Sequence, residues 1–258
     1  MCSKYSTETA AEAFTRLSAK VVLTLSIPLF KKPVKPGEIY QVSGESGSGK
    51  TLFLLDIAKE CILDKQNGGL EIGVVFIACG KSFPWLTFIE MLEATVKKKA
   101  GSSKYGLLEK IVMTCLSRFQ YMEVLDSDEF TRGLARLEHI TFAHPNLARV
   151  LLIDDVTTFC WLDIDHLTAK QGDHCRKLKR FVTEHNTAIF AANRISGDSR
   201  SKIYKSKVNG LLRYCWSKVI TDTITLAEDK TTGRFKASLK DQTVYFQIKD
   251  ERIEYQRM

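Results

Sequence analysis

Long apolar runs are missing from this sequence of 258 residues. No stretch approaches the roughly 20 apolar residues that a membrane-spanning helix needs, and the first residues form no apolar signal core. We therefore expect a soluble protein that is not secreted. Proline and glycine are scarce as well, with 5 and 15 residues, while 44% of the residues are hydrophobic. This composition excludes wholesale disorder, and the length excludes a mini-domain held together by disulfides.

Paired cysteines are also missing. None of the seven cysteines belongs to a Cys-x-x-Cys pair, their number is odd, and they stand at positions 2, 61, 79, 115, 160, 175 and 215. Four of them lie in apolar runs, so we expect reduced, buried side chains in an intracellular protein. The excess of one charge sign is modest, with 38 Lys and Arg against 30 Asp and Glu and a net charge of +8. This excess permits binding to nucleic acid or to an acidic partner without selecting either.

The hydrophobic pattern alternates between strands and helices. Apolar runs predict strands at 39–42, 72–77, 149–153, 187–192 and 219–226, and helical periodicity predicts helices at 51–63, 83–99, 107–118, 126–142 and 174–184. Residues 120–125 look extended, and alternation around Thr232-Gly233-Arg234 indicates hairpins toward the end of the sequence. We predict an α/β fold whose mostly parallel sheet is flanked by helices and carries antiparallel C-terminal strands.

A short helix is expected before the first strand. Thr9-x-x-Glu12 has the form of a capping box, and Ala10, Phe14 and Leu17 share one helical face. We divide the chain into an N-terminal helix and lead-in, residues 1–30, and a core domain, residues 31–258.

The strongest motif lies between a predicted strand and a predicted helix. Gly44-Glu45-Ser46-Gly47-Ser48-Gly49-Lys50-Thr51 fits G-x-x-x-x-G-K-[ST], the P-loop. The backbone N–H groups of such a loop and the dipole of the following helix can wrap a phosphate. Lys50 would reach the β and γ phosphates, and the Thr51 hydroxyl would bind Mg²⁺. We therefore predict ATP and Mg²⁺ as ligands; a flexible turn with a solvated lysine is the alternative.

A carboxylate is expected to complete the metal site. The apolar run from Val150 to Ile153 ends in Asp154 and Asp155. P-loop proteins hold Mg²⁺ with an aspartate at the end of a second strand, so Asp154 is the candidate ligand beside Thr51. The side chain of Asp155 is expected to point to the opposite face of the strand.

These motifs, in this order, resemble the RecA-type recombinases and, within them, a small eukaryotic recombinase paralogue. The resemblance covers roughly residues 30 to 226 and is carried by 35–51, 61–71, 74–77, 151–154, 159–161, 178–184, 189–191 and Trp216. It implies a RecA-type P-loop ATPase core that binds ATP and Mg²⁺. It further implies a nuclear protein of homologous recombination and DNA repair, which joins another paralogue and stabilises or remodels a recombinase filament on single-stranded DNA.

The sequence departs from the family at the catalytic glutamate. By register from Phe76-Ile77, Gly80 occupies that position, and no carboxylate occurs between Glu71 and Glu90. A placed general base contributes about 10²- to 10⁴-fold, so the resemblance implies ATP binding with weak or absent hydrolysis. Asp155 is the alternative base, and the catalytic residue stays unassigned.

A basic stretch, residues 194–213, falls where the family places its second DNA-binding loop. The candidate DNA-binding residues are Arg194, Arg200, Lys202, Tyr204, Lys205 and Lys207, whose cations could neutralise phosphates while the ring stacks on a base. The alternative is a solvated basic loop.

Two other functions also remain open for the whole protein: a P-loop enzyme, either an active ATPase or a small-molecule kinase, and an adaptor that needs no nucleotide.

Overall fold

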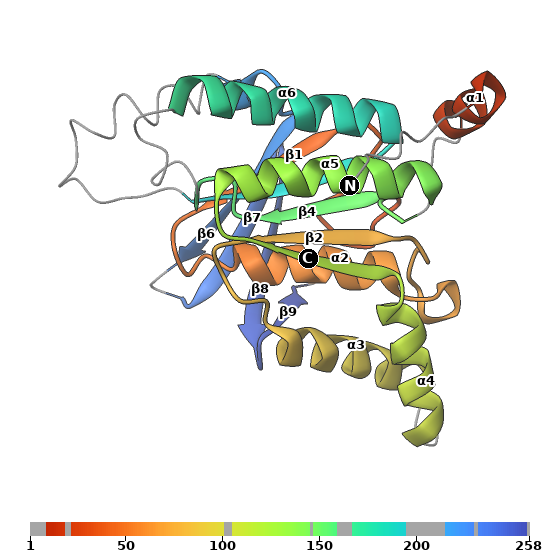
Figure 1. Cartoon of the computed structure of the whole chain (residues 1–258). Helices are drawn as coiled ribbons and strands as arrows, with labels where there is room; N and C mark the ends of the chain where they lie inside the picture. The colour runs from red at the N-terminus through yellow and green to blue at the C-terminus, as the bar shows by residue number, and fades with distance from the viewer. Residues whose placement is uncertain are drawn as a thin grey trace.

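A single sheet forms the centre of the molecule. The computed structural model describes residues 9–18, 22–100, 105–144, 147–158, 167–194, 215–229 and 232–256. Within these ranges, nine strands pair in the order β3-β2-β4-β5-β1-β6-β7-β8-β9 (Figure 1). The strands are β1 (Ile39–Gly44), β2 (Val74–Cys79), β3 (Phe119–Val124), β4 (Val150–Asp154), β5 (Ala188–Arg194), β6 (Asp222–Asp229), β7 (Arg234–Leu239), β8 (Gln242–Lys249) and β9 (Arg252–Tyr255).

Helices cover both faces of the sheet. The helices are α1 (Ala10–Ser18), α2 (Lys50–Ile62), α3 (Trp85–Ala100), α4 (Tyr105–Leu116), α5 (Ser127–Ala143) and α6 (Leu167–His185), with a 3₁₀ turn η1 (Lys65–Asn67). In Figure 1, α5 and α6 lie on one side of the strands and α2, α3 and α4 on the other. In the sheet order, the six strands β3, β2, β4, β5, β1 and β6 pair in parallel, and β7, β8 and β9 are added antiparallel. The predicted α/β class is confirmed, and the arrangement is consistent with a RecA-like core.

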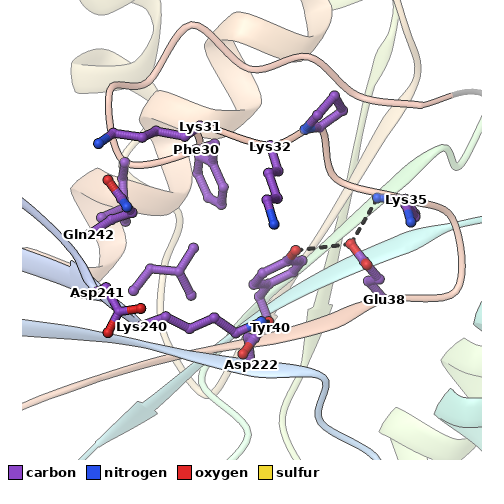
Figure 2. Close-up of a pocket in the computed structure, with 13 residues that line it drawn as sticks. Phe30, Lys31, Lys32, Lys35, Glu38, Tyr40, Asp222, Lys240, Asp241 and Gln242 are labelled. Carbon is purple, nitrogen blue, oxygen red and sulfur yellow. Dashed lines mark hydrogen bonds and ion pairs between the residues drawn. The ribbon is translucent and has the colours of Figure 1, made fainter.

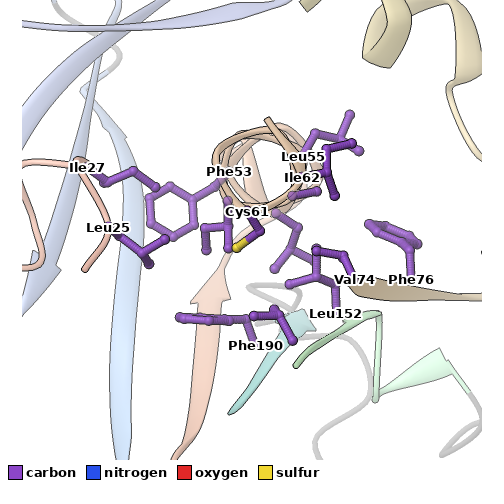
Figure 3. Close-up of a cluster of buried hydrophobic side chains, with 14 of the residues drawn as sticks. Leu25, Ile27, Phe53, Leu55, Cys61, Ile62, Val74, Phe76, Leu152 and Phe190 are labelled. Carbon is purple, nitrogen blue, oxygen red and sulfur yellow. The ribbon is translucent and has the colours of Figure 1, made fainter. Parts of the chain in front are cut away.

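Strand alternation divides the interior into two hydrophobic clusters. Phe76 of β2 packs into the cluster that contains α2, whereas its neighbour Ile77 packs with residues of α5 and α6. Successive side chains of a strand point to opposite faces, so a strand covered on both sides must be apolar throughout. Figure 3 shows the α2 side, where Phe53 lies next to Leu25 and Ile27 of the lead-in and the strand residues Val74, Leu152 and Phe190 lie across from the helix.

The lead-in before β1 belongs to the α2 cluster. Leu23, Leu25, Ile27 and Leu29 are all at most 4% exposed, and Leu23 forms a bridge with Val34. The division of the chain at residue 30 stays a prediction. The N-terminal capping box is present, because the Thr9 N–H and hydroxyl both donate to Glu12 Oε2 at 2.8 Å.

Two elements begin three or more residues away from their predicted starts. Helix α6 begins at Leu167 rather than at 174. The sequence pattern missed its first two turns because their residues are mostly polar and include Gly172, so hydrophobic periodicity begins only at Cys175. Strand β6 begins at Asp222 rather than at 219. The apolar Val219 and Ile220 instead lie in a turn whose N–H groups both donate to the Trp216 carbonyl.

The described ranges also show the state of the cysteines and whether a helix could span a membrane. Five cysteines lie in the described ranges, all as free thiols, and four of them are buried. Burial raises the pKa of the Cys175 thiol to about 12. Across those ranges, no helix combines the length and the apolar character needed to cross a membrane.

Candidate nucleotide-binding site

The P-loop joins the end of β1 to the start of α2. Gly49 lies at φ +85°, a left-handed conformation that glycine adopts without steric cost. At Gly44 the constraint is space, since a Cβ would lie 2.3 Å from Ser48 Oγ and 2.7 Å from the Leu226 carbonyl oxygen. No side chain caps the start of α2, so its first N–H groups remain available to an anion.

Lys50 is folded over the loop. Its side chain is nearly buried, and Nζ donates to the carbonyl oxygens of Gly44 at 2.9 Å and Glu45 at 2.6 Å. Burial lowers the pKa of Lys50, and the carboxylates of Asp155 and Asp154 oppose this effect. A bound phosphate would likewise favour the charged ammonium, so the position suits an anionic ligand.

Thr51 and Asp154 meet although 103 residues separate them in the sequence. The Thr51 hydroxyl donates to Asp154 Oδ2 at 2.6 Å, and Asp154 is 4% exposed. Hydroxyl and carboxylate oxygens are the hard ligands that Mg²⁺ prefers. Within the described part of the chain, the buried Ser48 hydroxyl finds no hydrogen-bond partner. The residues present therefore fit a magnesium nucleotide, and their assigned roles stay predictions.

Lys81 is a site residue that the sequence analysis missed. Its Nζ lies 3.6 Å from Asp154 Oδ1 and 3.4 Å from Asp155 Oδ2. The two carboxylates therefore approach the same cation, contrary to the expectation that Asp155 points away. Strand β4 ends at Asp154, so strand alternation does not govern Asp155. The signal that could have revealed Lys81 is its position just after β2, whose end meets that of β4 at one sheet edge.

Gly80 has no side chain to act as a base. Its φ is +64°, and a Cβ there would lie 3.1 Å from Thr158 Cγ2. The alternative base, Asp155, is already engaged, since its Oδ1 accepts from the Thr157 N–H at 2.9 Å and from the Thr157 hydroxyl at 2.6 Å. The structure therefore supplies no carboxylate at position 80, and the roles of the P-loop and of Asp154 stay predictions.

Arg194 lies at the rim of this site. It is the last residue of β5, pairs with Gly44 in the sheet register, and is exposed. Its N–H donates to the Thr157 hydroxyl at 3.3 Å. The other candidate DNA-binding residues, Arg200, Lys202, Tyr204, Lys205 and Lys207, lie outside the described residues.

A mostly parallel sheet, a P-loop sequence after β1 and an aspartate at the end of β4 are consistent with a RecA-like α/β core. The chain is 27% identical over 262 residues to the DNA repair protein XRCC2 of Mus musculus, covering 93% of this chain and 91% of that protein. It is also 27% identical over 244 residues to the DNA repair protein XRCC2 homolog of Arabidopsis thaliana, covering 78% of this chain and 64% of that protein. No family model matches the sequence. These similarities support an XRCC2-like paralogue of the RecA family, as the resemblance predicts.

Proposed function

We propose that this protein binds ATP with Mg²⁺ and hydrolyses it slowly or not at all. The contact between Thr51 and Asp154 is the observation that carries the proposal, because it brings the P-loop together with the aspartate at the end of β4. Lys50 binds the β and γ phosphates, while Thr51 and Asp154 hold the metal. Bound Mg²⁺ supplies charge neutralisation on the phosphates.

We further propose a role in DNA repair by homologous recombination in the nucleus. The support is the similarity over most of the chain to two proteins named as DNA repair proteins. In this role the protein joins another recombinase paralogue and stabilises or remodels a recombinase filament on single-stranded DNA. The net charge of +8 is compatible with a DNA-bound assembly.

The recombination role is tested by co-purification and filament lifetime. The tagged chain, recovered from nuclei, is expected to bring down a second recombinase paralogue. Adding that purified pair to a recombinase filament on single-stranded DNA is expected to change the filament's dissociation rate. An unchanged dissociation rate, together with rapid phosphate transfer from ATP to a small molecule, would favour a P-loop kinase instead.

Slow ATP turnover is expected from the purified protein, both alone and with single-stranded DNA. The reason is the missing carboxylate at Gly80, and the expected rate is well below the ~1 s⁻¹ that is low for a typical enzyme. Phosphate release measured over hours is the assay. The variant Asp155→Asn serves as the comparison, because a robust ATPase that this change abolishes would identify Asp155 as the base.

The basic loop is expected to bind DNA through phosphates. Replacing Lys202, Lys205 and Lys207 together with alanine should lower single-strand affinity and flatten the slope of log affinity against log salt by about two, at ~0.7 for each phosphate contact. Affinity is measured by fluorescence anisotropy at several salt concentrations. ATP binding should persist in this variant. An unchanged slope with loss of filament association would instead make the loop a protein contact.

A further inference from the structure

A second candidate site lies at the sheet edge opposite the P-loop. A pocket of about 280 Å³ opens where the lead-in, β1, the start of β6 and the turn between β7 and β8 meet (Figure 2). The P-loop follows the C-terminal end of β1, whereas this pocket lies around Glu38 and Tyr40 at the N-terminal end. At about 3.3 Å per residue, the six-residue strand separates the two sites by roughly 15–20 Å. Occupation of one site therefore leaves the other open.

The floor of the pocket is apolar and aromatic. Leu29, Phe30, Tyr40 and Leu239 contribute to its lining. The Phe30 and Tyr40 rings meet edge to face with centroids 6.0 Å apart, and Tyr40 is 7% exposed. Rigid aromatic walls of this kind favour insertion of one apolar side chain, and the volume lies just below the roughly 300–1,000 Å³ of typical small-molecule pockets.

The mouth of the pocket is basic. Lys31, Lys32 and Lys35 are exposed there, and over the part of the chain that the structure describes they form no ion pair. Figure 2 shows the Lys32 side chain extending toward Tyr40. A ligand that enters the pocket must therefore pass three ammonium groups.

The carboxylates of the pocket are largely engaged. Asp222 pairs with Lys240 at 2.7 Å. Glu38 Oε2 accepts from the Tyr40 hydroxyl at 2.9 Å and from the Lys35 N–H at 2.8 Å. Asp241 is the remaining carboxylate in the lining. The excess of unpaired charge at the mouth is therefore positive.

We propose that this pocket binds an acidic peptide segment of a partner protein. One apolar side chain of the peptide fills the space between Phe30, Tyr40 and Leu239. Carboxylates that flank it lie against Lys31 and Lys32. The apolar floor favours such a peptide over nucleic acid, because it accepts an apolar side chain, and the basic mouth steers its approach.

The test is fluorescence anisotropy with a labelled twelve-residue peptide that has one central phenylalanine flanked by Asp and Glu. The double variant Lys31→Glu, Lys32→Glu should weaken binding about tenfold, since each change replaces attraction with repulsion. The matched control is Lys98→Glu, Lys110→Glu, which changes the same number of charges at exposed positions elsewhere. This control should bind the peptide as the wild type does, within about twofold.

A second probe tests the apolar half of the site. A peptide with serine in place of its phenylalanine should bind the wild type at least tenfold more weakly, because the pocket is then unfilled. Equal loss of binding in both double variants overturns the proposal, because binding would then depend only on the net charge of the protein. Equal affinity for both peptides also overturns it, because the pocket would then not bind the phenylalanine. Stronger binding of single-stranded DNA, lost only in the Lys31, Lys32 variant, would make the surface a nucleic-acid site instead. ATP binding should be unchanged in every variant.

Discussion

Lys50→Ala is expected to lower the affinity for Mg²⁺-ATP by about 10- to 150-fold, because hydrogen bonds to charged groups contribute about 1.5–3 kcal/mol. In the structure the Lys50 ammonium lies over the loop and contacts the Gly44 and Glu45 carbonyl oxygens. With alanine the phosphates would meet the N–H groups of the loop but no cation at that point. Equilibrium titration with a fluorescent ATP analogue, with and without Mg²⁺, measures the change.

The matched control for this variant is Lys110→Ala, which removes an exposed ammonium from α4. Its affinity should match that of the wild type. Equal binding by wild type and Lys50→Ala would remove the phosphate site from the proposed function. This result would favour the alternative function, an adaptor that needs no nucleotide.

Phe190→Ala is expected to destabilise the fold by about 3–5 kcal/mol, the usual loss for a buried aromatic side chain. Phe190 is fully buried on β5, stacked on Tyr40 at 5.2 Å and edge to face with Phe30 at 5.8 Å. Removing the ring leaves a cavity that the lead-in, α2 and the central strands share. Chemical denaturation followed by circular dichroism measures the free energy of unfolding.

Tyr245→Ala is the comparison for this stability measurement. Tyr245 is 45% exposed on β8, so its loss should cost no more than about 1 kcal/mol. Similar midpoints for the wild type and Phe190→Ala would contradict the two-cluster packing described above.

The strand order explains which parts of the site the sequence could predict. The P-loop is a contiguous motif, so Lys50 and Thr51 could be assigned from spacing alone. Asp154 followed from its position at the end of an apolar strand. Lys81 lies just after the apolar strand β2, but its contact with Asp154 also depends on β2 lying beside β4, and no local pattern encodes that pairing. The direction of the Asp155 side chain was predicted wrongly because β4 ends at Asp154, so the alternation of side chains along a strand does not extend to Asp155.

The fold shows the same division between local and distant information. Continuous apolar runs predicted the central strands, because a strand buried on both faces must be apolar throughout. The first turns of α6 were missed because their residues are polar, and propensity alone does not separate them from a loop. The pocket around Tyr40 was invisible to sequence analysis, since it joins the lead-in to a turn about 200 residues further along the chain.

The backbone at Gly80 bears on how the protein could regain a catalytic base. A glutamate there would adopt a left-handed conformation, which costs an L-residue about 1–2 kcal/mol, and its Cβ would press on Thr158. One substitution would therefore introduce the carboxylate together with strain. On the proposed function, replacing Gly80 by glutamate would therefore carry a cost in stability together with any gain in hydrolysis.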